Sequence, residues 1–247
     1  MKKMISTFAL GALLATTANA DFARVEAGAG GWMQTPSGIA EYNSGSAITG
    51  SDTLNEDMDT SAYVWMLVKH PLPIIPNVRV EYTTIHATGN ATGSWNGLTV
   101  TSASADSELD ITEYDIIPYY NILDNTFWIT VDLGLDIKVV DSDYKIDSLN
   151  YEDTSTTVVP MLYLRGRVEI PTTDLGVEAD AKYISNGSST IYDVRAKLDY
   201  TFDITPIIQP GLEVGYRVQK INIDEDDVDV RTDIDFAGLY VGAMLRF

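Results

Sequence analysis

Charged side chains recur at every second position in several segments of this sequence. Examples are 178–182 (EADAK) and 193–199 (DVRAKLD), where apolar residues separate the charges. Carboxylates and cations at this density could serve acid–base catalysis or form ion pairs. A period of two places all of these charges on one face of a β-strand. The strands that carry them therefore decide which chemistry is available.

The most regular of these strands lies within 127–140. Every second residue from Phe127 onward is apolar, and the other face includes Asp132, Asp136 and Lys138. A globular strand averages about 5–6 residues, whereas a tilted transmembrane strand needs about 9–11. Charges cannot lie in a dry protein core without partners. The pattern therefore predicts a strand of a membrane barrel, with one face toward lipid and one toward a lumen.

Ten segments carry similar alternation, and the gaps between them differ in length. The short gaps are 71–76, 121–125, 171–173 and 203–206, and the longer or more polar ones are 35–59, 90–106, 142–155, 186–189 and 223–230. We therefore predict an all-β, closed, antiparallel transmembrane barrel of ten strands, with short periplasmic turns and longer acidic extracellular loops. The expected strands are 21–34, 60–70, 77–89, 107–120, 126–141, 156–170, 174–185, 190–203, 207–222 and 231–247.

The first twenty residues read as a cleaved signal peptide. Lys2 and Lys3 precede an apolar stretch, and Ala18-Asn19-Ala20 forms an A-x-A cleavage site. The predicted domains are thus a signal peptide, 1–20, and one barrel, 21–247. The sequence contains no cysteine, so disulfide and thiolate chemistry are excluded. Its formal charge of −20 argues against nucleic acid as a partner.

Strand phase assigns charged residues to the lumen. Ten are basic and ten are acidic, so the lumen is expected to hold a neutral ion-pair network. Such a network could fill and stiffen the barrel or line a narrow path for small polar solutes, since ten strands leave little space. The residues are Arg24, Glu26, Arg79, Glu81, Asp132, Asp136, Lys138, Arg165, Arg167, Glu169, Glu178, Asp180, Lys182, Asp193, Arg195, Lys197, Asp199, Glu213, Arg217 and Arg246.

The surplus negative charge falls in the predicted extracellular loops. With their strand ends, these loops carry twenty acidic residues against Lys145, Lys220 and Arg231. Solvated loops of this kind keep a surface soluble. The alternative is loose binding of divalent cations, which could bridge to lipopolysaccharide. We predict no specific metal site and no cofactor. The densest run consists of Asp224, Glu225, Asp226, Asp227 and Asp229.

Catalytic constellations are weak in this sequence. It has only two histidines: His70 falls in a predicted periplasmic turn, and His86 shares the phase of the lipid-facing Val78 and Val80. A rim protease of the omptin type would need a histidine that faces acidic residues across a cleft. We therefore predict no catalytic residues and no enzyme. Gly28-Ala29-Gly30-Gly31 lacks the Lys-Ser/Thr of a phosphate loop and indicates close packing instead.

Three further expectations concern strand details. Both faces of 60–70 are apolar, and the phase of 107–120 shifts around Glu113 to Asp115, which suggests a bulge. Aromatic residues gather near strand ends and predict two interfacial girdles. Phe22, Tyr119, Tyr120, Phe127, Phe202 and Phe247 fall at the periplasmic edge, and Trp32, Tyr183 and Tyr192 toward the other.

The chain resembles bacterial outer-membrane β-barrel proteins. The resemblance rests on Ala18-Asn19-Ala20, the alternating strands and the final segment 238–247 (GLYVGAMLRF). In that segment Leu239, Val241, Ala243, Leu245 and Phe247 resemble the C-terminal assembly signal of such barrels. Gly30-Gly31 and 110–120 are similar to an outer-membrane protein family of unassigned function. The resemblance implies outer-membrane lipid, lipopolysaccharide and the insertion machinery as partners.

Three functions remain open on sequence alone. The first is a small structural barrel or narrow pore for small polar solutes. The second is a surface binding or adhesion module that uses its acidic loops for cations, lipopolysaccharide or a host partner. The third is the rim protease, which the orientation of His86 disfavours.

Overall fold

The computed structural model describes residues 23–44, 47–72, 74–205, 207–223 and 230–247. The expected signal peptide, 1–20, and the acidic run within 224–229 lie outside the described residues. Within these ranges, no helix is long and apolar enough to cross a membrane.

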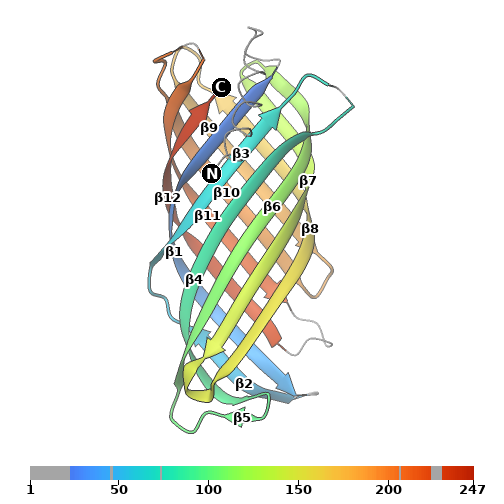
Figure 1. Ribbon diagram of the computed structural model, residues 1–247. Helices are drawn as coiled ribbons and strands as arrows, with labels where there is room; N and C mark the ends of the chain where they lie inside the picture. Colours follow the sequence, from blue (N-terminus) through green and yellow to red (C-terminus); the bar gives the residue numbers. More distant parts are fainter. Residues whose placement is uncertain (1–22, 45–46, 73, 206, 224–229) are drawn as a thin grey trace, which may run out of the picture.

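The molecule is a closed antiparallel barrel with ten strand positions in its wall (Figure 1). Closure joins β1 to β12, with Ala27 opposite Leu245 and Trp32 opposite Tyr240. The predicted ten-stranded barrel is thus confirmed. The strands are β1 (Arg24–Ser44), β2 (Ala47–Leu54), β3 (Asp59–Lys69), β4 (Asn77–Trp95), β5 (Leu98–Thr99), β6 (Ala105–Thr126), β7 (Ile129–Ile146), β8 (Tyr151–Glu169), β9 (Leu175–Ser185), β10 (Thr190–Thr201), β11 (Gln209–Ile223) and β12 (Val230–Arg246); the 3₁₀ turn η1 (Asp147–Leu149) follows β7.

β2 and β3 share one position in the wall, between β1 and β4. β3 pairs with β1 up to Gln34↔Asp59, and β2 pairs with β1 from Ile39↔Thr53 onward. Residues 55–58 leave the ladder between the two strands. The expected loop 35–59 is therefore mostly strand, and the same is true of much of 142–155. The physical reason is that these residues pair their backbones in the wall, while the outward side chains face water and the inward ones, such as Leu54 and Ile146, are buried.

The outer surface divides into an apolar belt and a polar wall. The belt is the band of exposed apolar side chains that includes Met66, Ile116, Leu135, Leu164 and Val241. Beyond it, on the side away from the termini, the outward residues become polar. They include Thr84, His86, Glu108, Asp110, Asp141 and Asp143. A membrane-spanning strand needs only about 9–11 residues. The 22-residue β6 therefore extends well beyond the bilayer, and we call this part of β1, β2, β4 and β6–β8 the extracellular wall.

Two details of the sequence interpretation are wrong. β4 and β6 pair without interruption from Asn77↔Tyr119 to Ala91↔Ala105, so there is no bulge at Glu113 to Asp115. The irregularity of β6 lies instead around Asn121 to Leu123. Trp32 and Tyr119 are not girdle residues, because both are buried inside the barrel. Apolar and aromatic residues on the inner face obscured the phase in each case.

Candidate functional site: the charged lumen

The structure places all twenty predicted lumen charges on the inner face of the barrel. Seventeen of them are buried. The other three, Arg24, Glu169 and Arg246, are partly exposed and lie at the periplasmic end. β-Strand alternation positions them, since the intervening residues of the same strands form the apolar belt.

The periplasmic end is closed by an ion-pair cluster that joins the first and last strands. Arg246 on β12 donates through Nε to Glu26 on β1 at 2.8 Å. Arg24 also pairs with Glu26, and its guanidinium lies 3.5 Å from Glu169 on β8. This cluster bridges opposite parts of the rim, because β1 and β12 do not neighbour β8 in the wall.

Glu178 on β9 is the hub of the next layer. Its carboxylate is 1% exposed and receives four cations. Arg165 approaches to 2.6 Å, Arg79 and Arg167 to 3.3 Å, and Lys197 to 3.5 Å. Because β4, β8 and β10 supply these cations, one carboxylate ties together strands from several parts of the wall.

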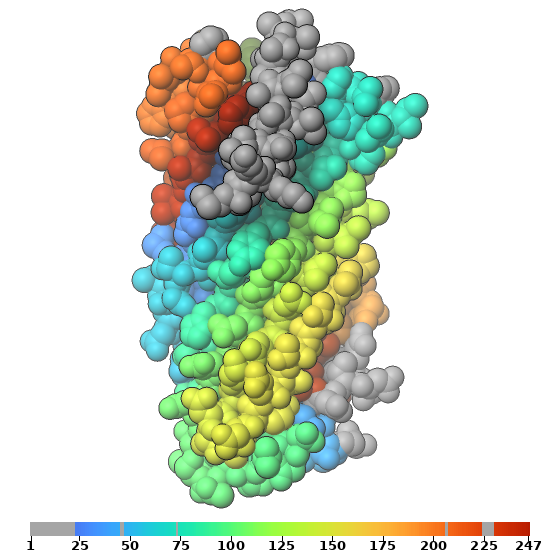
Figure 2. Space-filling view, in the orientation of Figure 1, coloured from blue at the N-terminus to red at the C-terminus, as the bar shows by residue number. Residues whose placement is uncertain are grey.

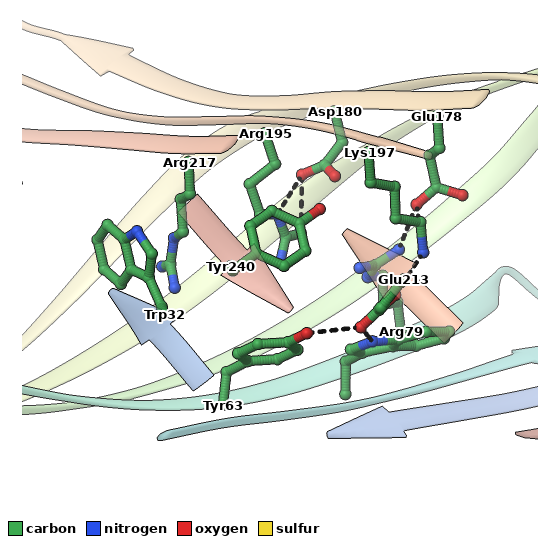
Figure 3. A pocket seen from close by; sticks show the side chains of 11 residues that line it. Trp32, Tyr63, Arg79, Glu178, Asp180, Arg195, Lys197, Glu213, Arg217 and Tyr240 are labelled. Carbon is green, nitrogen blue, oxygen red and sulfur yellow. Dashed lines mark hydrogen bonds and ion pairs between the residues drawn. The ribbon is translucent and has the colours of Figure 1, made fainter. Parts of the chain in front are cut away.

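A small cavity of about 20 Å³ lies beside this hub and is lined in part by Glu178 (Figure 3). Glu213 lies beside it and accepts hydrogen bonds from the Tyr63 hydroxyl at 2.8 Å and from Trp65 Nε1 at 2.9 Å. Lys197 Nζ lies 3.0 Å from the other Glu213 oxygen and 4.6 Å from the centroid of the Trp65 ring. Roughly 10–15 Å³ is the least that holds one water molecule. The cavity therefore has room for about one water.

A layer of lysines and carboxylates continues the network toward the extracellular side. Lys182 lies 2.7 Å from Glu81 and 3.1 Å from Asp115. Lys138 lies 2.9 Å from Asp115. Asp136 is fully buried, its oxygens make no hydrogen bond to a donor, and its nearest ammonium, that of Lys182, is 4.0 Å away. Asp136 is thus the weakly bound member of the layer.

Arg217 on β11 forms the edge of the charged layers on the extracellular side. It pairs with Asp193 at 2.8 Å and Glu113 at 3.2 Å, and it donates to the Thr83 hydroxyl at 3.0 Å. Its guanidinium carbon lies 4.5 Å from the centroid of the Trp32 ring, a cation–π contact. The fully buried Trp32 thus separates the charges from the apolar residues on the extracellular side.

Apolar side chains fill the lumen beyond Arg217. They include Leu54, Ile85, Ile111, Ile234 and Phe236, all of which are buried. A second cluster closes the extracellular end around Trp95, whose ring centroid lies 5.3 Å from that of Tyr144 and 5.8 Å from that of Tyr42. Charged, apolar and aromatic layers thus follow one another along the axis.

The sequence interpretation missed three charged residues of the lumen, Asp52, Glu113 and Asp115. All three are buried, and with them the described part of the lumen holds thirteen acidic residues against ten basic ones. Unbroken alternation from Tyr119 back to Ser107 would have found Glu113 and Asp115, whereas Asp52 falls in the expected loop 35–59. It also missed the polar aromatic residues Tyr63 and Trp65, which hydrogen-bond to Glu213. The signal for these was the doubly apolar segment 60–70, since the apolar inner face of that strand consists of side chains with polar atoms.

The outward-facing residues do not converge on a comparable site. Among the described residues, no three histidine or acidic side chains are placed to hold a metal ion together. His86 lies on the extracellular wall and its Nδ1 is 2.7 Å from Asp110. Leu239, Val241, Leu245 and Phe247 of the predicted assembly signal are exposed on the outer face, and Ala243 lies on the same face.

Comparisons with known proteins agree on the fold. No protein-family profile and no curated protein matches the sequence. The structure is similar to the outer-membrane protease OmpT from Escherichia coli, with TM-score 0.51, 10% identity and coverage of 94% of this chain and 99% of that one. It also matches the translocator domain of the autotransporter NalP from Neisseria meningitidis, with TM-score 0.43, 16% identity and coverage of 97% and 93%. For OprG from Pseudomonas aeruginosa the TM-score is 0.38 at 11% identity, with coverage of 93% and 98%.

The likeness to OmpT, at such low identity, concerns the fold alone. A barrel fold with a closed wall and an apolar belt around it places the protein in a bacterial outer membrane. A closed barrel leaves no strand edge unpaired in lipid, which is the condition for β-structure to cross a bilayer. The chain is an integral outer-membrane β-barrel.

Proposed function

We propose that the protein is a non-enzymatic, sealed outer-membrane barrel with a structural role. The observation that carries this proposal is the filling of the lumen. The cavity among the charges of the lumen is about 20 Å³, and apolar residues pack on its extracellular side. A hydrated ion or solute would have to displace paired charges and then cross an apolar layer. A structural barrel is therefore favoured over a narrow pore.

Conductance in a planar bilayer tests this proposal. Refolded protein is added to the bilayer, with a general porin as the positive control. Heat-modifiable mobility on a gel first establishes that the barrel has folded. We expect no discrete conductance steps. Steps that scale with protein concentration would overturn the sealed-barrel proposal and favour the narrow pore.

The second candidate is a surface module that uses the extracellular wall. Strands that extend beyond the belt present Glu108, Asp141, Asp143 and Glu152 to the outside. Carboxylates at this density attract divalent cations and could bridge to lipopolysaccharide. Calcium-dependent, chelator-reversible retention of the micellar protein on immobilised lipopolysaccharide would support this role. Equal retention with and without calcium would count against cation bridging.

We do not propose the rim protease. The described His86 and Asp110 face outward from the wall, rather than across the mouth of the barrel. Hydrolysis of basic peptides by the refolded protein, lost on His86→Ala, would favour the rim protease after all and contradict the non-enzymatic role. We further propose lipid and the outer-membrane insertion machinery as partners, the latter through the C-terminal residues 239–247.

A further inference from the structure

Large apolar side chains project from three of the four periplasmic turns. Ile74 in the β3–β4 turn is 86% exposed, Phe127 in the β6–β7 turn 82%, and Ile204 in the β10–β11 turn 69%. The β8–β9 turn differs, since residues 171–174 (PTTD) are exposed but carry no large apolar side chain besides Pro171. Exposed apolar surface of this extent marks a contact with another apolar phase.

The β3–β4 turn leans outward, onto the lipid-facing side of the wall. The hydroxyl of Tyr120, an exposed residue of β6 at the edge of the belt, donates to the Ile74 carbonyl at 2.8 Å. This bond reaches across β4, which lies between β3 and β6. In Figures 1 and 2 the turn projects sideways from the upper right of the barrel. Leu72 and Ile75 are also exposed on it.

His70 holds this turn in place. Its ring accepts a hydrogen bond from the Leu72 N–H at 3.2 Å and contacts the Pro76 carbonyl through Nε2 at 3.1 Å. The main-chain N–H of His70 donates a hydrogen bond to Asn77 Oδ1 at 2.9 Å. A turn fixed in this way presents its apolar side chains in one orientation, rather than leaving them to collapse onto the barrel.

The β6–β7 turn displays its aromatic pair at a cost. Phe127 and Trp128 have φ angles of 53° and 65°, a left-handed conformation that is unfavourable for bulky residues. Asparagine or glycine would occupy these positions without strain. Aromatic rings favour the membrane–water interface, so immersion there would offset the strain.

We propose that the β3–β4, β6–β7 and β10–β11 turns lie in the headgroup region of the periplasmic leaflet, with phospholipid as their partner, whereas the polar β8–β9 turn stays in water. The turns continue the apolar belt directly, as the Tyr120–Ile74 contact shows at one of them. Lipid surrounds that belt on all sides, whereas a protein partner would cover one sector. The proposal concerns the rim of the barrel and is independent of whether the lumen conducts.

Tryptophan fluorescence can test this placement in reconstituted vesicles. The chain has four tryptophans; Trp32, Trp65 and Trp95 are buried in the lumen, and Trp128 is exposed. Lipids brominated near the ester groups quench tryptophans at the interface, and acrylamide quenches those in water. We expect brominated lipid to quench the wild-type protein, and Trp128→Phe to abolish that quenching.

The Trp128→Phe background then carries matched reporters on two turns. Ile74→Trp places a reporter on an apolar turn, and Thr173→Trp places one on the polar turn. We expect brominated lipid to remove most of the Ile74→Trp reporter signal and to leave the Thr173→Trp signal open to acrylamide. Heat-modifiable mobility establishes folding of both variants before the measurement.

Three outcomes would overturn the proposal. Quenching of the Ile74→Trp reporter by acrylamide alone would place the turn in water. Protection from both quenchers would mean that protein covers the turn. Equal quenching of both reporters by lipid would mean that the whole rim is immersed, without the distinction between turns.

Discussion

The side-chain amide of Gln34 donates a hydrogen bond to the main-chain carbonyl of His86 at 3.0 Å. Gln34 is fully buried and reaches this carbonyl from inside the barrel. His86 lies on β4 between Thr83, which still pairs with β3, and Gly89, which pairs with β2. On the side of β2 and β3, His86 has no strand partner, because residues 55–58 leave the wall; on its other side it pairs with Asp110 of β6. Gln34 therefore replaces a missing backbone donor.

Gln34→Leu removes this donor at nearly constant volume. The His86 carbonyl then loses its partner, and we expect a loss of about 1–3 kcal/mol in the free energy of unfolding. Guanidinium unfolding of the micellar protein, followed by tryptophan fluorescence, measures it. Gln209→Leu, at the partly exposed start of β11, is the control and should cost less. Equal losses would show that Gln34 does not support the interrupted wall.

Glu178→Gln tests the hub of the ion-pair network. The substitution keeps the shape but removes the charge that Arg79, Arg165, Arg167 and Lys197 share. Buried cations without a counter-charge are costly, and we expect a loss of about 3–5 kcal/mol in unfolding free energy. Denaturant titration provides the value.

Glu169→Gln provides the comparison for Glu178→Gln. Glu169 also pairs with arginines, but its side chain is 34% exposed at the periplasmic end. Water can solvate the cations that it leaves, so the loss should be clearly smaller. If both variants lose the same amount, the charged lumen is more hydrated than the small cavity implies.

Tyr63 fits over a pair of glycines that face each other across the barrel seam. Gly30 on β1 pairs with Gly242 on β12. A Cβ at Gly242 would collide with the Tyr63 hydroxyl and lie 2.6 Å from the Ala29 carbonyl. Gly242→Ala is therefore expected to cost about 1–3 kcal/mol through overpacking. Unfolding titrations measure this, and Gly166→Ala, which meets nothing within 4 Å, should be nearly neutral.

A double-mutant cycle isolates the hydroxyl contact. Tyr63→Phe removes the colliding oxygen together with its hydrogen bond to Glu213. Gly242→Ala should therefore cost less in the Tyr63→Phe background than in the wild type. Additive losses would mean that the β1 backbone, and not Tyr63, requires the glycine.

The sequence predicted the architecture of the barrel because alternation is a property of the backbone. Strand phase alone placed residues such as Arg165 and Glu178 on the inner face, where the structure pairs them at 2.6 Å. It could not predict which cation meets which carboxylate. Some of those contacts cross the lumen between strands far apart in the sequence, as the contact of Arg79 with Glu178 does.

The errors of the sequence interpretation arise where the inner face is not polar. Trp32 is a largely apolar residue, but it packs against the Arg217 guanidinium inside the barrel. On β6, the buried Ile111 and Ile117 flank Glu113 and Asp115 on the same inner face. A lumen with apolar layers breaks the rule that polar residues face inward. The height of the extracellular wall was missed for a related reason, because its outward residues are polar while apolar residues such as Ile85 and Ile111 face inward.

His86 and Asp110 offer a pH-dependent readout of the extracellular wall, beyond the apolar belt. The His86 ring donates a hydrogen bond to the Asp110 carboxylate, and this bond raises the pKa of His86 above its ordinary value of 6.5. A raised folded-state pKa means that the pair stabilises the protein fully below pH 6.5. That contribution is lost as the pH rises through the higher folded-state value. The His86 side chain is 45% exposed, so solvent screening keeps the contribution small.

NMR titration of the imidazole protons in micelles measures this pKa directly. The chain has only two histidines, and His86→Gln assigns the signals. Asp110→Asn removes the charged acceptor, and we expect it to lower the pKa of His86. Asp141→Asn is the control, because Asp141 lies on the same wall but accepts a hydrogen bond from the Thr156 hydroxyl. This variant should leave the titration of His86 unchanged. An unshifted His86 pKa in Asp110→Asn would mean that the pair does not form in solution, and that β4 and β6 do not hold these two side chains together above the membrane.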